Sequence, residues 1–192
     1  MAVVAFEPLD FVGRQREMEE MLAALAAPGV VLVSGVAGMG KSRLLAEVMA
    51  RRSGPVIVTR AFLPERDEPW ALARSLLGEV AHRHPDVAAV LPARAAAALA
   101  DVVPELAELY PGDGGPLDPE SRRALALEGG VRLLGSVAAR GVCVAVDDVQ
   151  WADPTSLRLL DRFIRRVPEL SLALAYRPED VGLAIEHWPA GE

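Results

Sequence analysis

Residues 30–42, VVLVSGVAGMGKS, constrain the fold of this chain more than any other stretch. The near-continuous apolar run at 30–34 is typical of a strand covered on both faces of a parallel sheet. It leads into a glycine-rich turn, GVAGMGKS at 35–42, which fits G-x-x-x-x-G-K-[ST], and a helical pattern follows at 42–52. Strand, loop and helix in this order predict backbone N–H groups that converge on an anion at a helix N-terminus.

Three further apolar runs, at 56–59, 142–146 and 172–176, have the same buried-strand character. A helical pattern at 14–26 precedes the first of the four runs, and another at 155–166 follows the third. This alternation predicts an α/β fold with a mostly parallel sheet, right-handed crossovers and helices on both faces. We expect one three-layer domain over residues 1–192.

About eighty residues, 61–141, separate the second and third predicted strands, which is far more than one crossover needs. We expect a helical insertion here. Its helix-like stretches lie near 70–83, 87–109 and 120–140, interrupted by Pro85, Pro92, Pro104 and a turn at 110–119.

The glycine-rich turn predicts a site for the phosphates of ATP or ADP. Lys41 would reach the β- and γ-phosphates, and the Ser42 hydroxyl would join the shell of a Mg²⁺ ion. An incidental lysine in a glycine-rich turn is the alternative, and the complete pattern between strand and helix disfavours it. The predicted nucleotide-binding residues of the loop are Gly35, Val36, Ala37, Gly38, Met39, Gly40, Lys41, Ser42 and Arg43.

Two aspartates end the third predicted strand, in VCVAVDDVQWADP at 142–154. Carboxylates there are costly unless the site needs them, and Mg²⁺ needs a carboxylate nearby, usually through water. Asp147 is placed for this role if the strands at 30–34 and 142–146 are neighbours. Asp148 could orient the attacking water or accept its proton. Capping of a turn is the alternative for both.

Other polar residues near this edge admit two interpretations. Arg177 follows the fourth predicted strand, where it could sense the γ-phosphate or be a surface arginine. Asp153 precedes Pro154, as a helix N-cap does, so capping is favoured over chemistry. Gln150 could contact the γ-phosphate or water, and Trp151 is expected to pack.

Composition excludes some functions. The formal net charge of −7, from 27 acidic and 20 basic residues, argues against direct nucleic-acid binding by this segment. No apolar stretch approaches the roughly 20 residues that span a bilayer, and the N-terminus lacks the basic region of a secretion signal. We therefore expect a cytoplasmic location without membrane contact. The single cysteine, Cys143, is expected to be a buried core residue.

Four segments together resemble one family: FVGRQREMEEML at 11–22, GVAGMGKSRLL at 35–45, VAVDDVQWADPTSLRLL at 144–160 and ALAYRPED at 173–180. They look like the ATPase module of STAND-class signal-transduction ATPases, related to AAA+ proteins. Large LuxR-type transcriptional regulators with an N-terminal ATP-binding domain are the most similar members. The likeness covers nearly the whole chain.

This resemblance implies roles for particular residues. Asp147 and Asp148 match the Mg²⁺-associated acid and the catalytic acid, and Arg177 matches the sensor arginine. The segment that lines the adenine side in such proteins is matched by Phe11, Val12, Gly13 and Arg14. The partners it implies are downstream domains: a winged-helix lid, a sensor region and often a DNA-binding helix-turn-helix.

The family's strand order is 5-1-4-3-2, and residues 181–192 are too short and broken to predict the fifth strand. We therefore expect either a fragment of a longer regulator or a naturally short protein. Without that strand, the phosphate-loop strand would be an apolar sheet edge, which invites self-association.

The function expected first is a Mg·ATP-dependent switch with slow hydrolysis in a transcriptional regulator. A small-molecule kinase is the second candidate, with arginines of the insertion (Arg74, Arg83, Arg122 and Arg123) binding a phosphorylated acceptor. The third is a non-hydrolysing interaction module in which ADP is structural.

Overall fold

The computed structural model describes residues 13–109 and 115–180. Its sheet has four parallel strands in the order β1-β4-β3-β2. These strands are β1 (Gly29–Ser34), β2 (Val56–Arg60), β3 (Cys143–Asp147) and β4 (Ser171–Tyr176). The α/β class and the 1-4-3-2 part of the predicted order are confirmed. The condition set for Asp147, that the first and third strands are neighbours, is not met, because β4 lies between them.

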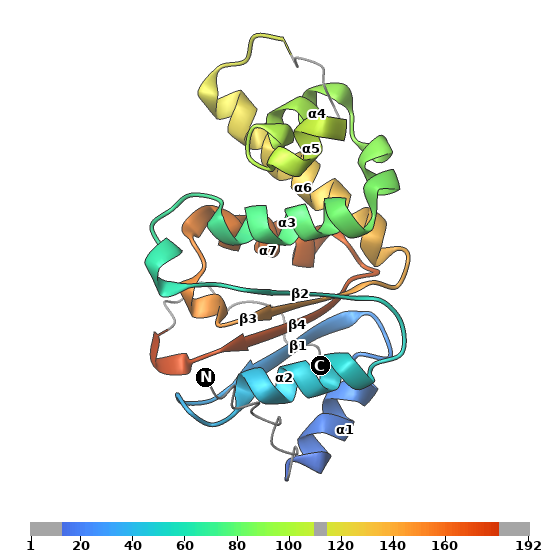
Figure 1. The fold of residues 1–192 in the computed structure, drawn as a ribbon, viewed down its shortest axis with the longest axis vertical. Helices are drawn as coiled ribbons and strands as arrows, with labels where there is room; N and C mark the ends of the chain where they lie inside the picture. Colours follow the sequence, from blue (N-terminus) through green and yellow to red (C-terminus); the bar gives the residue numbers. More distant parts are fainter. Residues whose placement is uncertain (1–12, 110–114, 181–192) are drawn as a thin grey trace, which may run out of the picture.

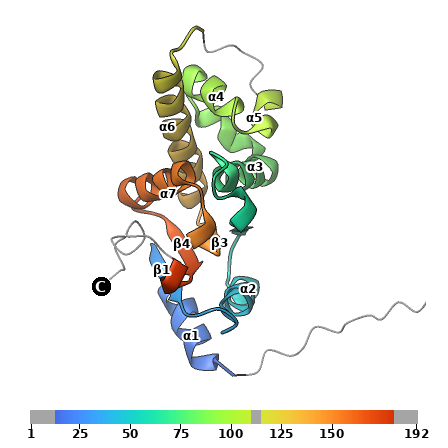
Figure 2. The ribbon, with the colours of Figure 1, turned by 90° about the vertical axis from the view of Figure 1, so that its left-hand side faces the viewer.

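Helices cover both faces of the sheet, as Figures 1 and 2 show. On one face lie α1 (Gln15–Ala24) and α2 (Lys41–Arg51). On the other lie α3 (Ala71–Arg83), α7 (Pro154–Arg166) and the C-terminal part of α6 (Pro119–Ala138). The two faces differ in residue size, because Cys143 and Ala145 of β3 point toward α1 and α2 whereas Val144 and Val146 point toward α3 and α7. Cys143 is buried, as predicted.

The segment between β2 and β3 is helical. It begins with a 3₁₀ turn, η1 (Leu63–Glu65), and α3. Further along, η2 (Pro85–Val90), α4 (Ala93–Ala100) and α5 (Pro104–Leu109) precede α6. The stretch at 87–109 is thus split where Pro92 and Pro104 interrupt it, because proline begins helices and cannot continue them. In Figure 1, α4, α5 and the first half of α6 project away from the sheet.

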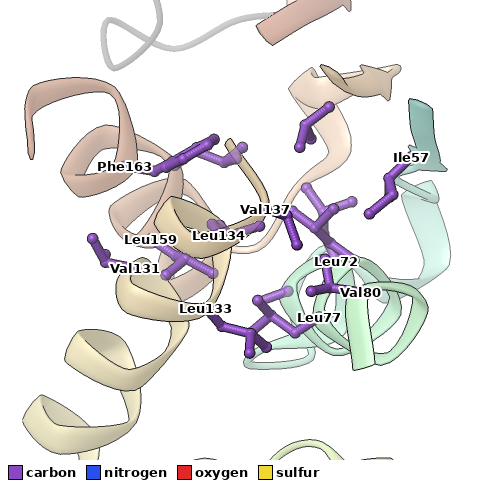
Figure 3. Packing of buried hydrophobic residues seen from close by; sticks show 14 of the residues in the cluster. Ile57, Leu72, Leu77, Val80, Val131, Leu133, Leu134, Val137, Leu159 and Phe163 are labelled. Atoms are coloured by element: carbon purple, nitrogen blue, oxygen red, sulfur yellow. The ribbon is translucent and has the colours of Figure 1, made fainter. Parts of the chain in front are cut away.

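One core joins this helical segment to the sheet. Figure 3 shows Ile57 of β2, Leu77 of α3, Leu134 of α6 and Phe163 of α7 converging, and all four side chains are fully buried. Gly130 lets α6 approach α7 closely, since a Cβ there would lie 2.9 Å from a methyl of Leu159. The position of the helical segment over β2 and β3 is therefore fixed by packing.

Among the described residues β1 pairs with β4 alone, and its residues are half-buried or exposed. Residues 181–192, where no fifth strand was predicted, lie outside the described residues, as do Phe11 and Val12. Self-association through this edge stays a prediction. None of the helices within 13–109 and 115–180 is long and apolar enough to cross a bilayer.

Candidate nucleotide site

The glycine-rich loop occupies the turn from β1 into α2. Gly38 and Gly40 have φ of 77° and 78°, a left-handed conformation that side chains disfavour, so these two positions need glycine. Gly40 is the N-cap of α2 and supplies no side-chain cap, so no capping side chain competes with a ligand at the start of this helix. Val36 and Met39 are about half exposed at the loop tip.

Lys41 is held by the loop itself. Its residue is 6% exposed, and its Nζ donates to the carbonyl oxygens of Gly35 at 2.5 Å and Val36 at 2.9 Å. The ammonium group therefore lies against the carbonyl groups at the start of the loop that the pattern assigns to the phosphates. It is also the only lysine in the sequence, beside nineteen arginines.

The acidic pair lies at the same sheet edge, because all four strands are parallel and their C-terminal ends coincide. Asp147 is the last residue of β3, and its Oδ1 accepts the Asp148 N–H at 2.9 Å. Asp148 follows with φ 51°, in the left-handed region, and is 4% exposed. This unusual backbone turns the Asp148 carboxylate away from the line of the strand.

The Asp148 carboxylate is surrounded by donors. Its Oδ2 pairs with Nη2 of Arg60, and its Oδ1 accepts from Nε2 of Gln150 at 2.9 Å. Arg177 Nε lies 3.7 Å from the same Oδ1, and the Arg177 backbone N–H donates to Oε1 of Gln150 at 3.2 Å. The structure thus brings Arg177 and Gln150 to Asp148.

Burial by itself would raise the pKa of the Asp148 carboxyl. The hydrogen bonds from Gln150 and Arg60, with the charges of the two nearby arginines, outweigh burial and hold this pKa below its usual value. The carboxylate is therefore ionised at neutral pH. In this arrangement it is better suited to orienting a water molecule than to taking its proton, because a low pKa makes a weak base.

Comparison with known proteins shows the family of this chain. A profile of the AAA ATPase domain matches residues 10–175. The chain belongs to the AAA ATPase domain family. It is also 33% identical over 166 residues to an uncharacterized protein of Rhizobium meliloti (strain 1021). That alignment covers 78% of this chain and 16% of the relative, so the chain spans a small part of the relative's length. No solved structure gives a significant match.

The oxygen donors of this AAA ATPase domain suit Mg²⁺. Ser42, in the first turn of α2, is exposed, and within residues 13–109 and 115–180 the ion-pair partner of Asp147 Oδ2 is Arg60 Nε, at 3.8 Å. A hydroxyl and a carboxylate that each keep a free lone pair match the preference of Mg²⁺ for oxygen ligands and retained waters. When bound, the ion would neutralise phosphate charge. Because β4 lies between β1 and β3, Asp147 is separated from the glycine-rich loop by the width of one strand.

The predicted adenine-side segment is only partly described. Gly13 and Arg14 lie just before α1 with φ of 85° and 55°, and Arg14 is the N-cap of that helix without a side-chain cap. Within α2, Arg43 Nε donates to Glu47 at 3.0 Å. The contribution of these residues to nucleotide binding stays a prediction.

Arg60 is a site residue that the sequence did not reveal. It ends β2, and the strand register places it opposite Asp147. The one available signal was a charged residue at the C-terminal end of an apolar run. The pairing of β2 with β3 brings it to the acids, although residues 61–142 separate the two strands in the sequence.

Asp153 is the helix cap that the sequence favoured, and it does more than cap α7. Its Oδ1 accepts from the N–H groups of Thr155 and Ser156, both at 3.0 Å, and from Trp70 N–H at 2.9 Å. The Ser156 hydroxyl in turn accepts from Ala73 N–H at 2.8 Å, so α3 is capped by side chains of α7. The acidic segment is thus tied to the start of the helical insertion.

We expect Asp153→Ala to lower the free energy of unfolding by about 3 kcal/mol, because a buried cap and the Trp70 bond are lost together. For a chain of this size that corresponds to a Tm lower by roughly 6–12 °C in a thermal melt. Asp118→Ala is the matched control. Asp118 also precedes a proline, but it caps α6 through Ser121 N–H alone and is exposed, so we expect a loss of only about 1 kcal/mol. Equal losses in the two variants would contradict this account.

Proposed function

We propose that the chain is a Mg·ATP-dependent switch module with slow hydrolysis, part of a signal-responsive transcriptional regulator of the STAND and LuxR type. The observation that carries the proposal is the common sheet edge: a loop with Lys41, followed by a helix without a side-chain cap, lies at the same edge as Asp147 and Asp148. Residues 61–141 are taken as a helical insertion into one P-loop domain.

In this proposal each group of site residues has its own role. Loop N–H groups and the start of α2 bind phosphate oxygens, and Lys41 exchanges its two carbonyl partners for the β- and γ-phosphates. Asp147 and Ser42 hold Mg²⁺. Asp148 orients the attacking water, and Arg177 supplies positive charge beside the γ-phosphate.

Slow turnover follows from the partners of Asp148. One oxygen is bonded to Arg60, and the other accepts from Gln150 beside Arg177. Both oxygens are therefore engaged, and a water molecule must compete for one of them. A change that releases Arg60 would speed the chemical step, which is the behaviour expected of a switch.

The regulatory role is supported by the sequence resemblance and by the length of the relative, of which the chain matches 16%. The kinase alternative is weakened by ion pairs in the insertion. Arg74 pairs with Glu68, Arg83 with Glu79 and Arg122 with Asp101, so these arginines have carboxylate partners already. Assay of phosphate release from Mg·ATP tests the proposal: slow release is expected, and absence of both binding and release would contradict it.

Arg60→Ala should raise the pKa of Asp148, because a hydrogen bond and a positive charge that lower it are removed. The acid limb of the pH–rate profile for ATP hydrolysis should then move to higher pH, since the carboxylate must stay ionised to orient water. Arg74→Ala, which removes an exposed arginine that pairs with Glu68, is the control and should leave the limb in place. A limb that moves to lower pH, or moves equally in both variants, would contradict the assignment of Asp148.

A further inference from the structure

A cavity lies in the helical insertion, between α4, the start of α6 and the start of α3. Its volume is about 250 Å³, and none of its lining residues belongs to the glycine-rich loop or the acidic pair. Apolar groups of Trp70, Val102 and Pro119 form much of the wall. At about 30 Å³ for a water molecule, this volume suits a ligand of about eight to ten non-hydrogen atoms. A small, mostly apolar cavity with a few polar groups is the usual form of a ligand site.

The charge of this cavity comes from one arginine. Of the charged side chains that line it, Arg122 and Asp101 form an ion pair with each other. Arg123 also lines the cavity and has no ion pair or hydrogen bond to any residue in the described ranges 13–109 and 115–180. A guanidinium group beside apolar walls matches the carboxylate of a small organic acid, which it can bind through two parallel hydrogen bonds.

The wall of the cavity includes a strained residue. Trp70 has φ 72°, and a bulky residue in this left-handed region costs on the order of 1–3 kcal/mol. Such strain concentrates at ligand clamps and switch regions. The Trp70 backbone N–H is bonded to Asp153, five residues after Asp148, so the residue that lines the cavity is tied to the acidic segment.

We propose that this cavity binds a small organic carboxylate with a compact apolar body, its carboxylate on Arg123 and its body against Trp70. The occupant shifts Trp70, and the Trp70–Asp153 bond carries the shift to the segment that holds Asp148. The binding half of this proposal, that the cavity takes up the acid, stands on the cavity alone. The coupling half, that the acid affects the segment holding Asp148, rests on the proposed nucleotide switch.

Calorimetry on the whole chain without nucleotide tests the binding half. Benzoate is the probe, hexanoate is an aliphatic second probe, and benzamide has the shape of benzoate without its charge. We expect saturable binding of at least one acid, with benzamide at least tenfold weaker. Arg123→Ala should weaken the acid at least tenfold, whereas Arg94→Ala, an exposed arginine of α4 outside the cavity, should not. Absence of saturable acid binding, or equal binding of benzamide, would overturn the proposal.

The coupling half is tested by the affinity for Mg·ATP with and without saturating acid. We expect at least a twofold change in the wild-type chain and none in Arg123→Ala. Acid binding without such a change would overturn the coupling and leave the site. If the chain does not bind ATP at all, the proposed function and the coupling both fail, and the nucleotide-free titration still decides whether the cavity is a site.

Discussion

Replacing Lys41 by alanine is expected to weaken Mg·ATP binding about 100-fold or more. The lysine would make two charge-assisted bonds to the β- and γ-phosphates, and their loss removes roughly 3 kcal/mol of binding free energy. The fold should survive, because in the described part of the chain Lys41 Nζ bonds to the carbonyls of Gly35 and Val36 in the adjacent loop and to no distant element. Calorimetric titration with Mg·ATP measures the change, and a thermal melt checks the fold.

Two further variants sharpen this result. Lys41→Arg keeps the charge but replaces a compact ammonium by a planar guanidinium, so we expect most of the affinity to be lost as well. Arg16→Ala removes the same charge from an exposed position on α1 and should leave the affinity unchanged. Normal ATP binding by Lys41→Ala would refute the assignment of the loop.

The second large effect is expected from Asp148→Asn. This variant should bind Mg·ATP within about threefold of the wild type, because Asp148 is assigned to the water and not to the nucleotide. Its rate of hydrolysis should fall about 100-fold or more, because the amide lacks the negative charge and one of the two acceptor oxygens that would orient the water. Single-turnover measurement of phosphate release separates this loss from any change in affinity.

The control for Asp148→Asn is Asp161→Asn. Asp161 lies on α7, is more exposed and pairs with Arg165 at 2.9 Å, so its loss should change neither binding nor rate. If Asp148→Asn hydrolyses ATP as fast as the wild type, the water-orienting role belongs to another residue. If it loses ATP affinity to the same degree as Lys41→Ala, Asp148 acts on the nucleotide or on the fold.

Much of this fold could be predicted because its signals are local. Four apolar runs gave the strands within one residue at each end, and Asp153 before Pro154 marked the start of α7. The loop GVAGMGKS contains both its glycines and its lysine within eight residues, so its chemistry can be read without any long-range contact. The prolines at 92 and 104 likewise marked where the insertion breaks.

The rest depended on contacts between segments far apart in the sequence. Chain order does not determine which parallel strands are neighbours. The order 1-4-3-2 came from the family resemblance, and with β4 between β1 and β3 the condition stated for Asp147 is not met. Arg60 meets Asp148 only through the register of β2 against β3. The bond from Ala73 N–H to the Ser156 hydroxyl, which caps α3, also joins residues 83 apart, and no local sequence pattern predicts it.

The central claim is that the loop of this AAA ATPase domain binds the phosphates of a nucleotide, and one calorimetric series tests it most directly. The wild-type chain is titrated with ATP, ADP and AMP in the presence of Mg²⁺. We predict saturable binding of one ATP or ADP per chain, and binding of AMP at least 100-fold weaker, because AMP lacks the phosphates that Lys41 and the loop would hold. Binding of AMP as tight as that of ATP, or no binding of any of the three, would contradict the claim.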